Sequence, residues 1–249
     1  EIGDERVIDT PLTESMIVGA SVGAALNGMR PVCEIQFADF IFPAFNQIVS
    51  EAARMRYRSN NGYAVPMVVR APYGGGVHGA LYHSQSVEAF FTHVPGLKVV
   101  VPSTPYDARG LLRSAIRDED PVLFFEHKKM YRSVRGDVPD TDYVVPIGRA
   151  AVTHPGSQVT VIAYGLMAHY ALEAADLVAD DGISVEVVDL RTLRPLDRET
   201  VLDSCPSSTN WSTPPPRSSP RKAPRATMAS WPRIWRRSCP TPRSRPANI

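Results

Sequence analysis

The chain has 249 residues, a formal net charge of +1 and 43% hydrophobic residues, a composition typical of a globular protein with a sizeable core. No apolar run reaches the ~18 residues of a membrane span and no basic-then-apolar leader is present, so we expect no membrane partner and no export. The three cysteines, Cys33, Cys205 and Cys239, form no close pair, which argues against a disulfide framework and favours the cytoplasm.

The charge is unevenly distributed along the chain. Nine of the 27 Lys and Arg residues lie in residues 206–249, which hold no Asp or Glu, so residues 1–205 carry 18 basic and 26 acidic side chains. This Pro-, Arg- and Ser-rich tail is typical either of a shifted reading frame or of a disordered basic arm. We expect the frameshift, and the start at Glu1 instead of methionine is typical of a fragment. The acidic body argues against a nucleic-acid partner for the arginines of the tail.

Short, apolar, β-rich segments alternate with helical patterns along residues 1–205, which predicts parallel α/β layers. The expected strands are residues 30–36, 67–72, 98–102, 121–127, 158–165 and 183–190. The expected helices are residues 14–28, 43–59, 104–118, 168–182 and 198–205. Thr104 and Pro105 are typical of a helix start, and Gly28 and Gly182 of helix ends.

The polar residues 130–148 interrupt this alternation and predict a linker between two α/β domains. We place the first domain at residues 1–135, the linker at 136–147, the second domain at 148–205 and the tail at 206–249. The second domain contains only two expected strands, so its α/β layer is predicted to be incomplete.

Common catalytic signatures, such as GxGxxG after a strand, the P-loop, GxSxG and HExxH, are absent from the sequence. Glu14 begins a helix of small and apolar residues, which we expect to pack closely on all sides. Such packing would partly desolvate the carboxyl group and suit it to sharing a proton with a buried base. The alternative is an acid that complements the dipole of the helix.

Two further groups of residues point to a ligand or to catalysis. Phe37, Phe40 and Phe42 follow an expected strand, where they offer either an aromatic face for a planar ring or core packing. In "HGALYHSQS", His83 precedes an expected helix with Ser84 or Ser86 as its N-cap. This histidine is either an active-site proton carrier or a surface residue.

Several long motifs together resemble one family over residues 5–205. They are "DTPLTE", "EIQFADFIFPAFNQIVSEAARMRYRS", "HGALYHSQSVEAFFTHVPGLKVVVPSTPYDARGLL", "AIRDEDPVLFFE" and "VVDLRTLRPLD". They resemble the beta subunits of thiamine-diphosphate-dependent 2-oxo acid dehydrogenases, those for branched-chain substrates (2-oxoisovalerate) first and those for pyruvate next. The resemblance implies a transketolase-like pyrimidine-binding domain followed by a transketolase C-terminal domain. It also implies oxidative decarboxylation with acyl transfer to a lipoyl arm. A catalytically dead remnant is the alternative.

The resemblance also implies roles for individual residues. Glu14 would contact a ring nitrogen of the aminopyrimidine of thiamine diphosphate and promote its imino tautomer. Phe40 would stack on that ring, and Gln36 would lie near the coenzyme. His83 would serve acyl transfer to lipoate, with His78 as an accessory residue.

The remaining implications concern ions and partner chains. Ala115, Asp118 and Asp120 match a loop that binds potassium through backbone carbonyls in some members; a solvated helix end is the alternative. The magnesium-diphosphate motif is missing from the sequence. The resemblance therefore implies an alpha subunit that supplies it in a heterotetramer, with a lipoyl acyltransferase core as a further partner.

Overall fold

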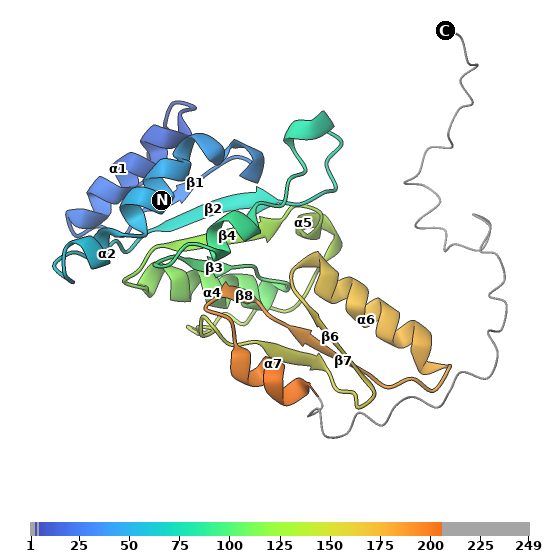
Figure 1. Ribbon diagram of the computed structural model, residues 1–249. Helices are drawn as coiled ribbons and strands as arrows, with labels where there is room; N and C mark the ends of the chain where they lie inside the picture. The colour runs from blue at the N-terminus through green and yellow to red at the C-terminus, as the bar shows by residue number, and fades with distance from the viewer. Residues whose placement is uncertain (1–2, 4, 206–249) are drawn as a thin grey trace, which may run out of the picture. The chain divides into compact units, whose positions relative to one another are not determined.

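The computed structural model describes residue 3 and residues 5–205 of the chain (Figure 1). The expectations about the tail concern residues outside this part. Two β-sheets, one of them largely parallel, carry helices on their faces, so the predicted α/β class is confirmed. Within the described residues, every helix is too short or too polar to cross a bilayer.

The strands and helices follow one another in close alternation. The strands are β1 (Val32–Glu34), β2 (Val68–Tyr73), β3 (Lys98–Val100), β4 (Val122–His127), β5 (Ala151–His154), β6 (Val159–Ala163), β7 (Val185–Asp189) and β8 (Thr192–Arg194). The helices are α1 (Glu14–Leu26), α2 (Met55–Arg58), α3 (Glu88–Thr92), α4 (Pro105–Arg117), α5 (Met130–Ser133), α6 (Leu166–Ala179) and α7 (Arg198–Ser204).

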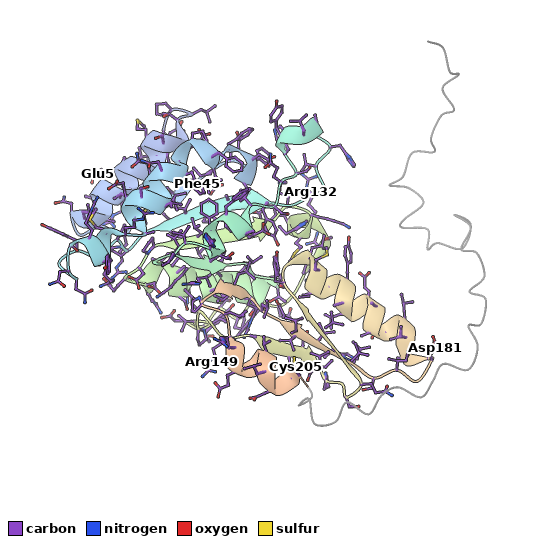
Figure 2. All side chains as sticks on the ribbon, viewed as in Figure 1. Glu5, Phe45, Arg132, Arg149, Asp181 and Cys205 are labelled. Atoms are coloured by element: carbon purple, nitrogen blue, oxygen red, sulfur yellow. The ribbon has the colours of Figure 1, made fainter. Side chains whose placement is uncertain are left out.

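The first sheet has the strand order β1-β2-β4-β3-β8, and its first four strands run parallel. Alternate residues of a strand face opposite sides of a sheet, and both sides are covered here. Val69 and Phe125 belong to the core on the side of α1 and α3. Val68 and Phe124 belong to the core beneath α4. This two-sided burial explains why the strand segments are almost continuously apolar, and Figure 2 shows the side chains that fill both layers.

The second sheet corrects the prediction of a two-stranded second domain. Its order is β5-β7-β6, with β5 antiparallel and β6 parallel to β7, and α6 covers one face through Ala168, Ala171 and Ala175. The further strand β8 pairs antiparallel with β3 of the first sheet. Both missed strands are short, and β5 is exposed at Val152, so neither has the continuous apolar pattern of a buried strand.

The prediction of a single helix over residues 43–59 is wrong. The segment consists of a 3₁₀ turn at Phe42–Ala44, a π-helix at Gln47–Ala52 and the short α2. The amide of Ala53 donates to the carbonyl of Ile48, a wide turn that apolar periodicity does not distinguish from an α-helix. By contrast, α4 begins as predicted, because the Thr104 side chain accepts from the Asp107 amide.

The predicted linker, residues 136–147, contains no helix or strand but lies closely on α4. The hydroxyl of Ser114 donates to the carbonyl of Val145 at 2.6 Å, and the rings of Tyr106 and Tyr143 stack with centroids 4.4 Å apart. A Cβ on Gly110 would lie 2.5 Å from Val145, so glycine is required for this close approach.

Candidate active site

The carboxyl ends of β1, β2 and β4 meet at one edge of the first sheet, because the three strands run parallel and are adjacent. Residues 37–40 follow β1, residues 74–86 follow β2, and Lys128 follows β4 directly. Open α/β sheets bind ligands at this edge, so the three segments are where a site is expected.

Three aromatic rings from two of these segments are in contact. The ring of His83 meets the rings of Phe37 and Phe40 edge to face, with centroids 4.6 Å and 5.6 Å apart. Phe37 and Phe40 also meet each other at 5.9 Å. Phe40 and His83 were both predicted for the site, and they are more than 40 positions apart in the sequence. The structure brings their rings into contact.

The His83 ring is oriented by its own loop. Its Nδ1 lies 2.8 Å from the carbonyl oxygen of Gly79, which can only accept, so in the neutral ring Nδ1 carries the hydrogen and Nε2 the lone pair. A Cβ on Gly79 would lie 2.6 Å from Nδ1, so only glycine allows this approach. The predicted caps Ser84 and Ser86 are wrong, since α3 starts at Glu88 after Val87.

Sequence reasoning missed Asp39, which lies between the two phenylalanines. Its carboxylate is buried, and it accepts from the amides of Ser84 and Gln85, the two residues after His83. Its position just after a predicted strand was a signal that could have drawn attention to it.

Glu14 is the first residue of α1 and is half-buried. The expected packing of this helix on all sides is wrong, because Val18, Val22 and Ala25 are buried while Met16 is 46% exposed. The Glu14 carboxylate forms no hydrogen bond or ion pair within the described residues, so its place in the site stays a prediction.

The other two predicted residues are less constrained. Gln36 follows β1 and is exposed, and His78 is exposed in the loop after β2. Neither side chain forms a hydrogen bond within the described part of the chain, and the structure does not bring them into the aromatic cluster.

Two basic side chains are buried at the end of β4. Burial lowers the pKa of His127 to about 4, and the ammonium groups of Lys128 and Lys129 act in the same direction. Burial also lowers the pKa of Lys128, which attraction to Asp39 opposes. The Lys128 ammonium lies 5.3 Å over the ring of Phe37, a cation–π arrangement.

The depressed pKa of His127 predicts an acid sensitivity. The unfolded chain has an ordinary histidine pKa near ~6.5, so stability is present above that pH and is lost as the pH falls towards about 4. We expect His127 to lower the free energy of unfolding by about 2 kcal/mol between pH 7 and pH 5. Urea unfolding should be measured at both pH values. The difference in free energy of unfolding between pH 7 and pH 5 should be smaller in His127→Gln than in the parent, and unchanged in His93→Gln, a control at an exposed histidine. An unchanged pH dependence in His127→Gln would contradict it.

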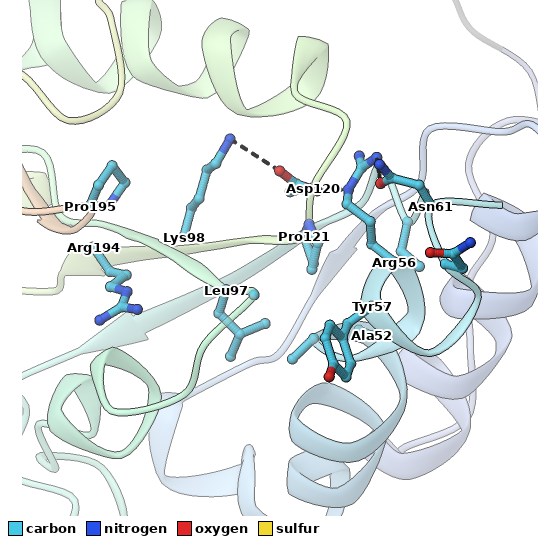
Figure 3. Close-up of a pocket in the computed structure, with 14 residues that line it drawn as sticks. Ala52, Arg56, Tyr57, Asn61, Leu97, Lys98, Asp120, Pro121, Arg194 and Pro195 are labelled. Atoms are coloured by element: carbon cyan, nitrogen blue, oxygen red, sulfur yellow. Dashed lines mark hydrogen bonds and ion pairs between the residues drawn. The ribbon is translucent and has the colours of Figure 1, made fainter. Parts of the chain in front are cut away.

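The structure also contains a cleft of about 560 Å³ at the opposite edge of the first sheet, lined by Lys98 and Pro121, where β3 and β4 begin (Figure 3). It is remote from the aromatic cluster, since the two lie at opposite ends of the parallel strands. We therefore assign the candidate catalytic site to the His83 edge and not to this cleft.

The predicted potassium loop borders this cleft. Ala115 is buried within α4, and both carboxylate oxygens of Asp118 lie 2.7 Å from the ammonium of Lys98. Arg56 donates to Asp120 at 2.6 Å, and Arg30 donates to the backbone carbonyl of Asp118 at 2.9 Å. Of the backbone carbonyls expected to hold potassium, that of Ala115 accepts from the Asp118 amide and that of Asp118 from Arg30, so potassium binding by this loop stays a prediction.

The pyrimidine half of thiamine diphosphate is a planar, uncharged ring with weakly basic nitrogens, which needs an apolar face and a carboxyl partner. The rings of Phe37 and Phe40 fit the first need at the His83 edge. Glu14 at the start of α1 has a half-buried carboxylate, and its role as the carboxyl partner stays a prediction. No group of three or more His, Cys, Asp or Glu side chains that could hold a metal ion occurs among the described residues.

Known proteins resemble this chain over most of its length. The Bacillus subtilis 2-oxoisovalerate dehydrogenase subunit beta is 65% identical over 204 residues, which are 82% of this chain and 62% of that protein. The Bacillus subtilis pyruvate dehydrogenase E1 component subunit beta is 52% identical, with 82% and 63% covered. These relatives confirm the predicted resemblance. A solved structure titled "Split gene transketolase, inactive beta4 tetramer" has a TM-score of 0.67 and 28% identity, with 80% and 62% covered.

The chain spans 62% of the length of the first of these relatives. Residues 2–134 match the family model "Transketolase, pyrimidine binding domain", and residues 148–213 match "Transketolase, C-terminal domain". Since the first match covers more than half of the chain, this protein belongs to the transketolase pyrimidine binding domain family, with a transketolase C-terminal domain following in the same chain.

Proposed function

We propose that this chain is the beta subunit of the dehydrogenase component of a 2-oxo acid dehydrogenase complex. Its substrates would be branched-chain 2-oxo acids, decarboxylated oxidatively with transfer of the acyl group to a lipoyl arm. The observation that carries the proposal is the contact of His83 with Phe37 and Phe40 at the carboxyl edge of a family-matched sheet. The 65% identity to a 2-oxoisovalerate dehydrogenase beta subunit favours branched-chain substrates over pyruvate.

Thiamine diphosphate, when bound, supplies the nucleophilic carbon that attacks the 2-oxo acid. Phe40 offers the apolar face for the pyrimidine ring, and Glu14 holds a proton towards a nitrogen of that ring. His83 presents Nε2, the nitrogen not bonded to Gly79, for proton movement during acyl transfer. Gln36 and His78 lie in flanking segments, where they would assist binding.

We also propose that the coenzyme site is shared with an alpha subunit, in a heterotetramer that docks on a lipoyl acyltransferase core in the cytoplasm. Two features support the alpha subunit. The chain has no magnesium-diphosphate motif, and the split-gene transketolase assembly that resembles it is described as an inactive beta tetramer.

This proposal predicts that thiamine diphosphate binds tightly only when alpha is present. Isothermal titration calorimetry with magnesium should give no micromolar binding by the 249-residue chain alone. After co-expression with the alpha subunit of the Bacillus subtilis enzyme, it should give micromolar or tighter binding. The assembly should then decarboxylate 2-oxoisovalerate faster than pyruvate with an artificial electron acceptor. Tight coenzyme binding by the isolated chain would contradict the shared site.

If the assembly forms and binds the coenzyme but decarboxylates neither acid, the catalytically inactive alternative holds. We retain this second candidate because the chain spans 62% of the length of the Bacillus subtilis 2-oxoisovalerate dehydrogenase subunit beta.

A further inference from the structure

Asp39 is a buried acid with an unusual set of partners. It lies in the 3₁₀ turn Ala38–Phe40, a few residues after the end of β1, and is 8% exposed. Its Oδ1 accepts from the amide of Ser84 at 3.4 Å, and its Oδ2 accepts from the amide of Gln85 at 3.3 Å. A buried carboxylate is stabilised by such bonds, and bonds to an ionised acceptor are stronger than those between neutral groups.

The two amides belong to the residues that follow His83, so Asp39 holds the backbone on one side of the histidine. On the other side, Nδ1 of His83 donates to the carbonyl of Gly79. The loop has few other anchors. The Gly74 amide donates to the Gln85 carbonyl at 2.9 Å, and the Ser84 hydroxyl donates to the Val77 carbonyl at 3.1 Å.

The turn that carries Asp39 also carries the two rings in contact with the histidine. Phe37 and Phe40 meet the His83 ring at interplanar angles of 84° and 86°. Residues 37–40 therefore contact the His83 imidazole through the rings of Phe37 and Phe40. The same segment binds the backbone amides of residues 84 and 85 through the Asp39 carboxylate. The buried ammonium of Lys128 lies over the ring of Phe37, so it also packs against this segment.

We propose that Asp39 is the positioning residue for His83. By fixing the amides of residues 84 and 85, it keeps Nδ1–H on the Gly79 carbonyl and presents Nε2 as the working nitrogen. The tautomer and orientation of a catalytic histidine are set by the bond that its other nitrogen makes, and a small misplacement of a reacting group is costly. The catalytic consequence rests on the proposed function, whereas the tautomer of His83 does not.

The first test reads the tautomer in the chain alone. Two-bond ¹H–¹⁵N correlation spectra of ¹⁵N-histidine-labelled protein at alkaline pH distinguish the two ring nitrogens, and His83→Gln assigns the signal among the six histidines. We expect the hydrogen on Nδ1 in the parent and a mixture of tautomers in Asp39→Asn. A hydrogen on Nε2 in the parent, or an unchanged spectrum in Asp39→Asn, would overturn the proposal.

A matched control separates positioning from loss of a buried acid. Asp107 is 6% exposed and pairs with Arg191 at 2.9 Å, away from the His83 loop. We expect Asp107→Asn to lower the unfolding midpoint and leave the His83 tautomer unchanged. If Asp39→Asn does not fold, Gln85→Pro removes one of the two amide donors while keeping Asp39, the Ser84 hydroxyl bond and the Gln85 carbonyl that accepts from Gly74, and should produce the same mixture of tautomers.

The second test uses the chain assembled with alpha. We expect Asp39→Asn to slow acyl transfer to a lipoyl domain by about 10- to 100-fold, while decarboxylation read by an artificial acceptor changes by less than about threefold. Asp39→Glu, which keeps the charge, should recover part of the transfer rate. Equal losses in both assays would contradict a positioning role. Failure of the parent assembly to turn over would count against the proposed function and leave the tautomer result standing.

Discussion

Replacing Glu14 by Gln in the chain assembled with alpha is expected to lower decarboxylation of 2-oxoisovalerate by about 10²- to 10⁴-fold, the usual contribution of a general acid or base. The amide has nearly the same shape as the carboxyl group but cannot exchange its proton with a ring nitrogen. Glu14 has no hydrogen bond or ion pair within the described residues, so its removal breaks no internal contact. Assembly with alpha should therefore be unaffected.

The control for this variant is Glu199→Gln. Glu199 also lies in the first turn of a helix, α7, but pairs with Arg149 at the surface. Steady-state decarboxylation, size-exclusion chromatography and thermal unfolding should be measured on both variants. We expect both to unfold within about 1 kcal/mol of the parent, the contribution of a charge to a helix dipole. A Glu14→Gln rate within about threefold of the parent would mean that Glu14 only complements the helix.

Replacing Gly96 by Ala is expected to give the largest loss of stability, about 3–5 kcal/mol, because overpacking and backbone strain act together. Gly96 has a φ of +92°, and a Cβ there would overlap the backbone carbonyl of Ala53. That carbonyl belongs to the backbone just after the π-helix, so it has little freedom to move away. The turn before β3 would have to shift, which disturbs the edge of the first sheet.

Substitutions at two further glycines distinguish the effect of overpacking from the effect of backbone strain. Gly28 has a φ of +88° with nothing within 4 Å of an added Cβ, and Gly75 has equally open space without a positive φ. Urea unfolding should rank the losses as Gly96→Ala, then Gly28→Ala at about 1–2 kcal/mol, then Gly75→Ala. If Gly96→Ala and Gly28→Ala lose the same free energy, the overlap with Ala53 is relieved without cost and the packing argument is wrong.

Much of the fold could be predicted from local patterns in the sequence. The strands β2 and β4 are mostly apolar because both of their faces are covered, and α4 begins where Thr104 and Pro105 indicate. The motifs around His83 and Phe40 also carried the family resemblance, and with it the expectation of a shared site. Each of these signals lies within a few neighbouring residues, where a hydrogen bond, a fixed φ or an apolar run acts directly on the backbone.

Other features depend on residues far apart in the chain, and only the tertiary structure decided them. The strand β8 has three residues and exists because Val99 and Val100 pair with it from about 90 positions away. The carboxylate of Asp39 reaches the amides of residues 84 and 85 because β1 and β2 run side by side and end at the same edge. No local pattern contains either fact, since the partner of a short strand or a buried acid is set by packing. The sequence alone pointed to Glu14, Phe40 and His83 as the residues expected to carry the chemistry, while the orientation of His83 and the bonds of Asp39 to residues 84 and 85 came from the three-dimensional arrangement.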